Sequence, residues 1–519
     1  FFQAEDGMRD RLRSRGRGDV YKRQVFMLDI FYDLCLYNAN VHFIIGEVLG
    51  IMSEDKKLGL GSVVSISVGL VIATSCLVSL GQGAGTVGVV FVFSMIIACL
   101  LNMTTVASLS ELNAIMPNTT GGLAQYTLAC LGPFPTLISM VGGYLLCNIL
   151  SSGVEASIFS YAMAQTIRLP IPSIGYTLVM TIVIMIANLH GVDMFAKIQD
   201  LVAFLLVGSM IIMGLIGMFK LGTGQVVSKP YTMATKPSEL FSATATAFWL
   251  FIGAEYVIPV SKSVKNAKRN VPLGMIIGLA LICGVQSIMV FGFHNYTPWQ
   301  ELMDSPAPHL LYGENLLGSV GKIWMTLVAA LAVVSTQNST VNGLASICQG
   351  MAKMNMMPRI FAKTNKHGVP WFGVVFVSVT IFIFALISNN SSSIISFLIL
   401  VGSVFWMISY VLAHVDVLIL RKRMPKVPRS FKVPFGPVFP VIGIVGTCYM
   451  ILNISSDPVE RNMIWLVVLI AFLVLAVYSF WWIKTRMKMP VFKSVPIQKV
   501  MAMENELFYT IRKRRGIWR

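Results

Sequence analysis

Long apolar runs separated by short polar segments make up most of this chain. Twelve such runs follow one another, at about 62–82, 88–112, 135–163, 174–190, 197–219, 241–260, 273–293, 322–346, 371–388, 394–418, 438–455 and 463–483. A helix needs about 20 predominantly apolar residues to cross a bilayer. Proline and glycine punctuate several of the connecting segments, where they end helices. The pattern therefore predicts an all-α integral membrane protein with about 12 transmembrane helices.

The composition agrees with a membrane protein. Of the 519 residues, 55 % are hydrophobic and 12 % are charged, and the mean hydropathy is +0.74. Soluble globular chains carry roughly 25 % charged residues. The net charge of +17 would suit a nucleic-acid partner, but most cations lie between apolar runs or after residue 484. That placement favours contact with anionic lipid headgroups, so the lipid bilayer is the expected partner and nucleic acid is not.

The placement of the cations also predicts the orientation. If the N-terminus is inside, the loops expected in the cytoplasm from Lys197 on, together with the C-terminal tail, hold 25 Lys and Arg residues, against six on the opposite side. Cytoplasmic loops of membrane proteins carry an excess of Lys and Arg. We therefore expect a multi-pass protein of the cytoplasmic membrane with both termini in the cytoplasm. Its sequence is compatible with a monomer or a homodimer.

The first 51 residues do not fit the rest of the chain. Residues 1–24 alternate arginine with small residues and resemble translated read-through of a sequencing adapter, and residues 25–51 have no clear periodicity. Met52 opens a short charged leader that runs into the first apolar span. We expect residues 1–51 to be a non-native leader, the alternative being an authentic basic extension. We expect residues 52–485 to form the membrane domain and residues 486–519 to form a basic cytoplasmic tail.

The sixth run is interrupted by residues that lipid does not favour. Gly253, Glu255 and Pro259 follow the aromatic residues Trp249 and Phe251 within a segment long enough to span the membrane. Irregular backbone at membrane depth is tolerated only where it is buried in protein or lines a watery cavity. Secondary transporters use such discontinuous helices to build a midplane site. Glu255 therefore has either a functional role or the structural role of capping freed amides.

A second carboxylate lies in the third run. Asn148, Ser151 or Ser152, and Glu155 recur at three- and four-residue steps, so they share one face of a helix. No Lys or Arg lies within the core of any run. We expect Glu155 to be hydrated, to bind a cationic substrate, or to be protonated and bonded to serines. In the first run, the small polar centre Ala73-Thr74-Ser75 could unwind.

Other motifs give weaker signals. The hydroxyls and amide at Ser335, Thr336, Asn338, Ser339 and Thr340 could ligate Na⁺, but such groups more often join membrane helices. The G-x-G-x-x-G match at 83–88 follows a membrane helix rather than a strand, which excludes a dinucleotide site. The histidines and cysteines have no metal-binding spacing, and no nucleophile–base pair is visible. We therefore expect that the protein is not an enzyme and binds no metal or cofactor. What it would require instead is a gradient of an ion or of a counter-substrate.

Three segments together carry a family resemblance. FIGAEYVIPVSKSVKNAKRNVP at 251–272, ASLSELNAIMPNTTGGLAQYTLACLGP at 107–133 and NSTVNGLASICQGMAKMNMMPRIFAKTNKHGVP at 338–370 resemble helix 6, helix 2 and helix 8 of the amino acid–polyamine–organocation (APC) transporters. The sixth helix is most similar to that of the basic amino acid and polyamine antiporters, through the W-x-F-I-G-x-E run at 249–255. The resemblance covers about residues 58–485.

The resemblance implies a LeuT-like fold of two inverted five-helix repeats plus two helices, with helices 1 and 6 broken. It implies transport of an amino acid by alternating access, with proton symport or amino acid exchange, and Na⁺ as a less favoured ion; a polyamine or organic cation antiporter is the alternative. Ala73-Thr74-Ser75 and Leu206 depart from the family pattern, and Thr340 replaces an aromatic, which argues against arginine as substrate. The expected substrate residues are Thr74, Ser75, Asn148, Trp249, Phe251, Ile252, Gly253, Asn338 and Thr340, and the expected proton-coupling residues are Glu155 and Glu255.

Overall fold

The computed structural model describes residues 58–116, 123–167, 170–190, 195–227, 236–258, 261, 264–388 and 391–502. These residues belong to one compact unit that begins at Leu58. The segment 1–51 that the sequence predicts to be non-native, and Met52 after it, lie outside the described residues, as does the end of the basic tail from residue 503.

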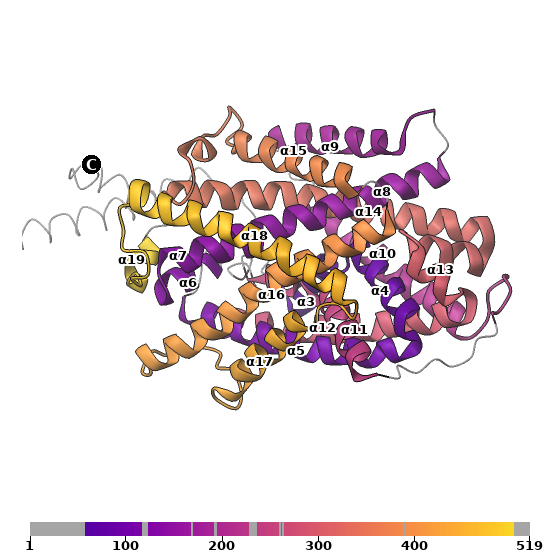
Figure 1. Ribbon diagram of the computed structural model, residues 1–519, viewed down its shortest axis with the longest axis horizontal. Coiled ribbons are helices and arrows are strands. Elements are labelled where there is room, and N and C mark those ends of the chain that lie inside the picture. The colour runs from indigo at the N-terminus through magenta and orange to yellow at the C-terminus, as the bar shows by residue number, and fades with distance from the viewer. Residues whose placement is uncertain are drawn as a thin grey trace, which may run out of the picture. The chain divides into compact units, whose positions relative to one another are not determined.

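The described chain is almost entirely helical (Figure 1). The helices are α3 (Leu60–Val71), α4 (Thr74–Val87), α5 (Phe91–Ile115), α6 (Leu123–Cys130), α7 (Pro133–Leu137), α8 (Cys147–Thr166), α9 (Ser173–Leu189), α10 (Phe195–Met218), α11 (Pro237–Phe248), α12 (Ala267–Tyr296), α13 (Trp299–Asp304), α14 (Pro308–Lys353), α15 (Trp371–Ser388), α16 (Ser392–Arg423), α17 (Val438–Leu452), α18 (Pro458–Trp482) and α19 (Ile497–Ala502). Short 3-10 turns lie at η1 (Gly88–Val90), η3 (Trp249–Phe251), η4 (Ala254–Val257) and η6 (Arg359–Ala362), and π-helical segments at η2 (Ile138–Leu146) and η7 (Ile483–Met487).

Each of the twelve predicted runs corresponds to a helix or a broken helix. Seven helical stretches of the described chain are long and apolar enough to cross a membrane, and four further apolar helices are shorter. The broken sixth segment, α11 with η3 and η4, completes the set of twelve. The segment at 294–321, between the seventh and eighth predicted runs, is largely helical, because it contains α13 and the first part of α14 up to a kink at Gly318.

The first membrane segment is broken at its centre, as predicted. Helix α3 ends at Val71, and Ile72 and Ala73 have extended backbone angles, with ψ of 91° and 167°. Helix α4 then begins at Thr74, which places the amides of Thr74 and Ser75 in its first turn. The first amides of a helix lack partners within the helix and attract negative charge.

The sixth segment is broken in the corresponding place. Helix α11 tightens into the turn η3, Ile252 is extended with ψ of 138°, and Gly253 has a φ of 114°. Only glycine adopts such a φ without strain, because it has no Cβ. The chain then resumes helical turns in η4, so Gly253 is the residue that permits this break.

The surface of the bundle is apolar where lipid would contact it. Large hydrophobic side chains are exposed along α9, α10, α15, α17 and α18. Helix α18 is the least buried of the seven long stretches, with 17 % of its most apolar window inside the protein. This helix follows the two sets of five membrane segments and packs on the outside of them.

A buried ion-pair cluster holds one end of the bundle together. Glu111 of α5 is 0 % exposed and receives Arg421 of α16 in a two-pronged contact of 2.9 and 2.6 Å. Arg429 and the amide of Val433 also contact the Glu111 carboxylate, at 3.1 and 2.8 Å. The cluster therefore joins α5, the end of α16 and the loop that follows α16.

Candidate substrate site

The two helix breaks face one another. The indole Nε1 of Trp249, in η3, donates a hydrogen bond of 3.1 Å to Oγ of Ser75, in the first turn of α4. The thiol of Cys76 lies 3.8 Å from the main-chain oxygen of Trp249. Residues 174 positions apart thus bring the start of α4 and the turn η3 together at one point.

Glu155 of α8 occupies the start of α4. Its Oε2 accepts the amide of Thr74 at 3.0 Å, and its Oε1 accepts the amide of Ser75 at 2.6 Å. The three residues are buried, and Glu155 is 2 % exposed. None of the partners that the sequence suggested for Glu155 was a backbone amide. The helix start supplies the compensating positive potential that a lysine or arginine would otherwise have to provide.

Glu255 lies beyond the second break and contacts a different helix. Its Oε1 accepts hydrogen bonds from the indole of Trp406 at 3.1 Å and from the hydroxyl of Tyr410 at 2.7 Å, both on α16. Its Oε2 accepts the amide of Gly253 at 3.1 Å, inside the break itself. These contacts are compatible with both predicted roles of Glu255, the structural and the functional one. Its carboxylate caps a freed amide and also links η4 to α16.

Trp249 is held from several sides. It is 4 % exposed and packs beside Gly402 of α16, where an added Cβ would come within 3.3 Å of the indole ring and 3.5 Å of the Cys147 sulfur. The Cys147 thiol also donates to the Gly402 carbonyl at 3.0 Å. Phe251 and Ile252 are buried next to it in the same break, with exposures of 1 % and 7 %. The absence of a side chain at Gly402 therefore leaves the space that the indole needs.

A cavity of about 540 Å³ opens one helical turn from this point, at the end of the bundle predicted to face outward. Ser79 on α4 and Thr246 on α11 line it, and they follow Ser75 and precede Trp249 by about one turn. Three carboxylates, from Asp304, Asp457 and Glu460, also line it. The remaining lining side chains that the structure describes are mostly hydroxyls, amides and apolar groups, without a lysine or arginine: Gln82, Gly83, Thr86, Ser242, Ala243, Met303, Ser391, Ser392, Ser393, Ser396, Ile399, Leu400, Ile454, Ser455 and Ser456.

The predicted substrate residues Asn148 and Asn338 each form a hydrogen bond with a neighbouring part of the bundle. Asn148 of α8 donates to the carbonyl of Tyr144 in the preceding segment η2 at 2.7 Å. Asn338 accepts from Asn188 of α9 at 2.8 Å. Thr74 approaches α14 at the Ala329 carbonyl, with its hydroxyl at 3.4 Å, and Asn338 lies nine residues farther along, about 13 Å at 1.5 Å per residue.

Thr340 is farther still from the breaks along α14. The neighbouring hydroxyls expected as sodium ligands bond to carbonyls of their own helix, Thr336 to Ala332 at 3.0 Å and Ser339 to Ser335 at 2.8 Å. Serine and threonine commonly make such bonds inside membrane helices. The Thr336 and Ser339 hydroxyls therefore each donate to a carbonyl of α14 in this structure.

Several residues of the site are not evident from the sequence. Trp406 and Tyr410 stand four residues apart on α16, so they share one face, but an aromatic pair in a membrane helix is usually core packing. Cys76 and Cys147 have the pattern of small buried hydrophobes, and Gly402 gives no signal of its own. Only the fold shows that these five residues surround Trp249 and Glu255.

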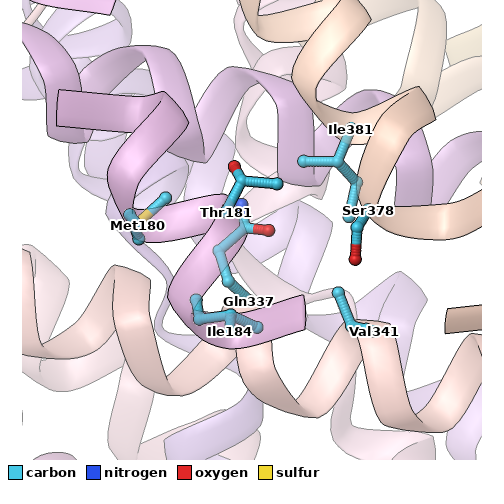
Figure 2. Close-up of a pocket in the computed structure, with 7 residues that line it drawn as sticks. All are labelled: Met180, Thr181, Ile184, Gln337, Val341, Ser378 and Ile381. Atoms are coloured by element: carbon cyan, nitrogen blue, oxygen red, sulfur yellow. The ribbon is translucent and has the colours of Figure 1, made fainter. Parts of the chain in front are cut away.

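A second, much smaller void lies between α9, α14 and α15. Figure 2 shows the seven side chains around it, among them Gln337 of α14 and Ser378 of α15. Its volume is about 10 Å³, which is at the lower limit for one water molecule. Gln337 also donates to the carbonyl of Ser152 on α8. This void is too small for an amino acid, so the helix breaks remain the candidate site.

The chain is similar to known transporters. Residues 58–476 match the model of a family described as amino acid permeases. The branched-chain amino acid permease BcaP of Bacillus subtilis is 24 % identical over 458 residues, which cover 83 % of this chain and 94 % of that protein. The human cystine/glutamate transporter is 22 % identical over 415 residues, 78 % of this chain and 81 % of that protein. The sequence predicted a likeness to basic amino acid and polyamine antiporters in particular. These relatives show a broader likeness to amino acid transporters that is not specific to that group.

Solved structures support the fold. A crystal structure of a mutant of the manganese transporter from Eremococcus coleocola aligns with a TM-score of 0.55 at 13 % identity, covering 81 % of this chain and 94 % of that one. This likeness confirms the expected LeuT-like arrangement of membrane helices with broken members and carries no information about substrate. The matched family consists of transporters rather than enzymes, and by the match over residues 58–476 the chain belongs to the amino acid permease family.

Proposed function

We propose that this permease moves an amino acid across the cytoplasmic membrane by alternating access, coupled to protons or to exchange for a second amino acid. The observation that carries the proposal is the meeting of the two helix breaks at Ser75 and Trp249. The start of α4 offers amides to a carboxylate, and the carbonyls around Trp249, Phe251 and Ile252 offer acceptors to an ammonium group. Gly253 permits this arrangement of the backbone.

The branched-chain and cystine/glutamate relatives support amino acids as the substrate class. Together they transport amino acids with very different side chains, as their names state. The substrate's own identity would then be set by the side chains around the breaks. Asn148 is one proposed selector, whereas Asn338 and Thr340 contribute to that selection only if α14 moves during the cycle.

Glu155 and Glu255 are the proposed proton carriers. Each is a carboxylate within a membrane segment, and each contacts one of the two breaks directly. Gain or loss of a proton would change how strongly each carboxylate holds its break, because hydrogen bonds to a charged acceptor are roughly twice as strong as those to a neutral one. Protonation would in this way alter the balance between the two access states.

A second candidate substrate class is favoured by the cavity. Three carboxylates and many hydroxyls line it, and no lysine or arginine is among its described lining residues. Such a surface attracts positively charged solutes, and polyamines and other organic cations belong to this class. The alternative function is therefore a polyamine or organic cation antiporter.

Uptake into liposomes tests the proposal. The full chain would be reconstituted, and each of the twenty radiolabelled L-amino acids, together with putrescine and spermidine, would be supplied outside. Three conditions are needed: an imposed pH gradient, a sodium gradient, and no gradient with unlabelled amino acid inside.

Uptake driven by the pH gradient would establish proton symport, and uptake that requires only internal amino acid would establish exchange. Preferential uptake of putrescine or spermidine would favour the cation alternative. Absence of uptake for every amino acid under all three conditions would reject the proposed function.

A further inference from the structure

We propose that Glu155 acts as a resident substitute for the substrate's carboxylate, so that an amino acid must displace it from the start of α4 in order to bind. This inference rests on the proposed transport of amino acids and makes Glu155 a specificity-determining residue. In this role Glu155 competes with the substrate's carboxylate for the start of α4, which is separate from its proposed role in proton coupling.

The geometry of the contact is that of a bound ligand. The two oxygens of Glu155 each take one amide, that of Thr74 at 3.0 Å and that of Ser75 at 2.6 Å. The donors belong to consecutive residues in the first turn of a 14-residue helix. A carboxylate of a free amino acid would use the same two donors in the same way.

The two carboxylates cannot be bound together. Each amide has one hydrogen, and both hydrogens are already directed at Glu155. Two carboxylates at this distance would also repel one another in an environment with little water. Occupation of the helix start by Glu155 and by the substrate is therefore mutually exclusive.

The surroundings keep Glu155 in place when substrate is absent. Thr74 and Ser75 are 1 % and 0 % exposed, and the indole of Trp249 covers Ser75 through its hydrogen bond to the hydroxyl. An empty helix start would leave two amides buried without a partner, and such groups are costly to desolvate. Glu155 satisfies them in the state that the structure presents.

The test compares amino acids with amides that lack the α-carboxylate. L-leucine is paired with L-leucinamide, and L-glutamate with L-isoglutamine, and equilibrium binding to the purified full chain is measured for wild type and Glu155→Gln. Glutamine keeps the volume of the side chain but removes its charge, so it holds the amides less strongly. We expect roughly tenfold tighter binding of the transported amino acid, and a change of less than about twofold for its amide.

A second pair of variants isolates the amide of Thr74. Proline is tolerated at the first position of a helix and has no N–H, so Thr74→Pro removes one donor without interrupting α4. Thr74→Val keeps the amide and removes the hydroxyl. The double variant Glu155→Gln/Thr74→Pro should lose the gain in affinity, whereas Glu155→Gln/Thr74→Val should retain it. Glu155→Ala provides the same comparison if the glutamine variant does not fold.

The outcomes separate this inference from the proposed function. If wild type takes up no amino acid in the liposome assay, the proposed function is rejected. If an amino acid is transported but binds Glu155→Gln with unchanged or weaker affinity, competition is overturned while transport stands. A loss of affinity for both the amino acid and its amide, with folding intact, would overturn it as well and would make Glu155 a ligand of the substrate's ammonium group.

Discussion

The hydroxyl of Tyr410 donates a hydrogen bond of 2.7 Å to the carboxylate of Glu255. The two residues are 155 positions apart, on α16 and on the turn that follows the break in the sixth segment. Since Glu255 also accepts the Gly253 amide, this bond connects the last helix of the second five-helix set to a break at the candidate site. A movement of α16 relative to the break must lengthen or break it.

Removing the Tyr410 hydroxyl should loosen this connection. We expect Tyr410→Phe to lower the free energy of unfolding by about 1.5–3 kcal/mol, the usual contribution of a hydrogen bond to a charged group, and to reduce proton-driven uptake. Thermal unfolding in detergent and liposome uptake provide the measurements. Tyr449→Phe, on the exposed side of α17, is the matched control and should change neither quantity. Equal effects of the two substitutions would contradict the assigned contact.

Gly253 should tolerate no side chain. At a φ of 114°, an alanine would be strained by about 1–2 kcal/mol. We expect Gly253→Ala to lower the unfolding temperature and to weaken substrate binding, because the strain is relieved by closing the break. Gly284→Ala serves as control, since Gly284 lies in α12 and a Cβ added there would meet no atom within 4 Å. Alanine is favoured over glycine within a helix, so the control should be as stable as wild type or more so.

The bond between Trp249 and Ser75 can be measured by a double-mutant cycle. Trp249→Phe and Ser75→Ala each remove one partner, and the double variant removes both. Because the two side chains contact one another, their effects on substrate affinity should not add, with a coupling energy of about 1 kcal/mol. Additive effects would show that the indole and the hydroxyl act independently in solution.

The ion-pair cluster around Glu111 should be far more sensitive than a surface pair. Glu111 is fully buried between Arg421 and Arg429, so Glu111→Gln leaves two cations with a weakened partner. We expect a loss of about 3 kcal/mol in unfolding free energy. In Glu314–Lys322, by contrast, the side chains are 47 % and 24 % exposed, and Glu314→Gln should cost less than about 1 kcal/mol. Thermal unfolding of Glu111→Gln and Glu314→Gln, measured under the same conditions, tests this difference in stability loss.

The predicted orientation can be tested by cysteine labelling in intact cells. Ser456 is exposed at the rim of the large cavity, and Thr364 is exposed in the loop between α14 and α15. Ser456→Cys should react with a membrane-impermeant thiol reagent added outside, whereas Thr364→Cys should react only after the cells are opened. The native cysteines of the described chain are buried or partly buried, which limits background. If Thr364→Cys reacts from outside and Ser456→Cys reacts only after the cells are opened, the predicted orientation is wrong.

The sequence by itself determined the number, order and approximate limits of the membrane segments. Apolar runs of bilayer length have few alternatives to helix, since lipid offers no hydrogen bonds to the backbone. It also located both breaks, because Gly253 and the small residues Ala73, Thr74 and Ser75 depart locally from the apolar pattern. The kink at Gly318 and the helical part of the preceding loop were not predicted, as their polar composition resembles that of a surface segment.

Only the tertiary structure decided the long-range partners of the two carboxylates. Glu155 bonds to amides about 80 residues away, and Glu255 bonds to aromatic residues more than 150 residues away. A search along the sequence for charged side chains overlooks a backbone amide as partner, because every residue has one and only a helix start leaves it free. The partner of a buried charge is thus set by which helices pack together, and the hydrophobic pattern within each helix does not specify that.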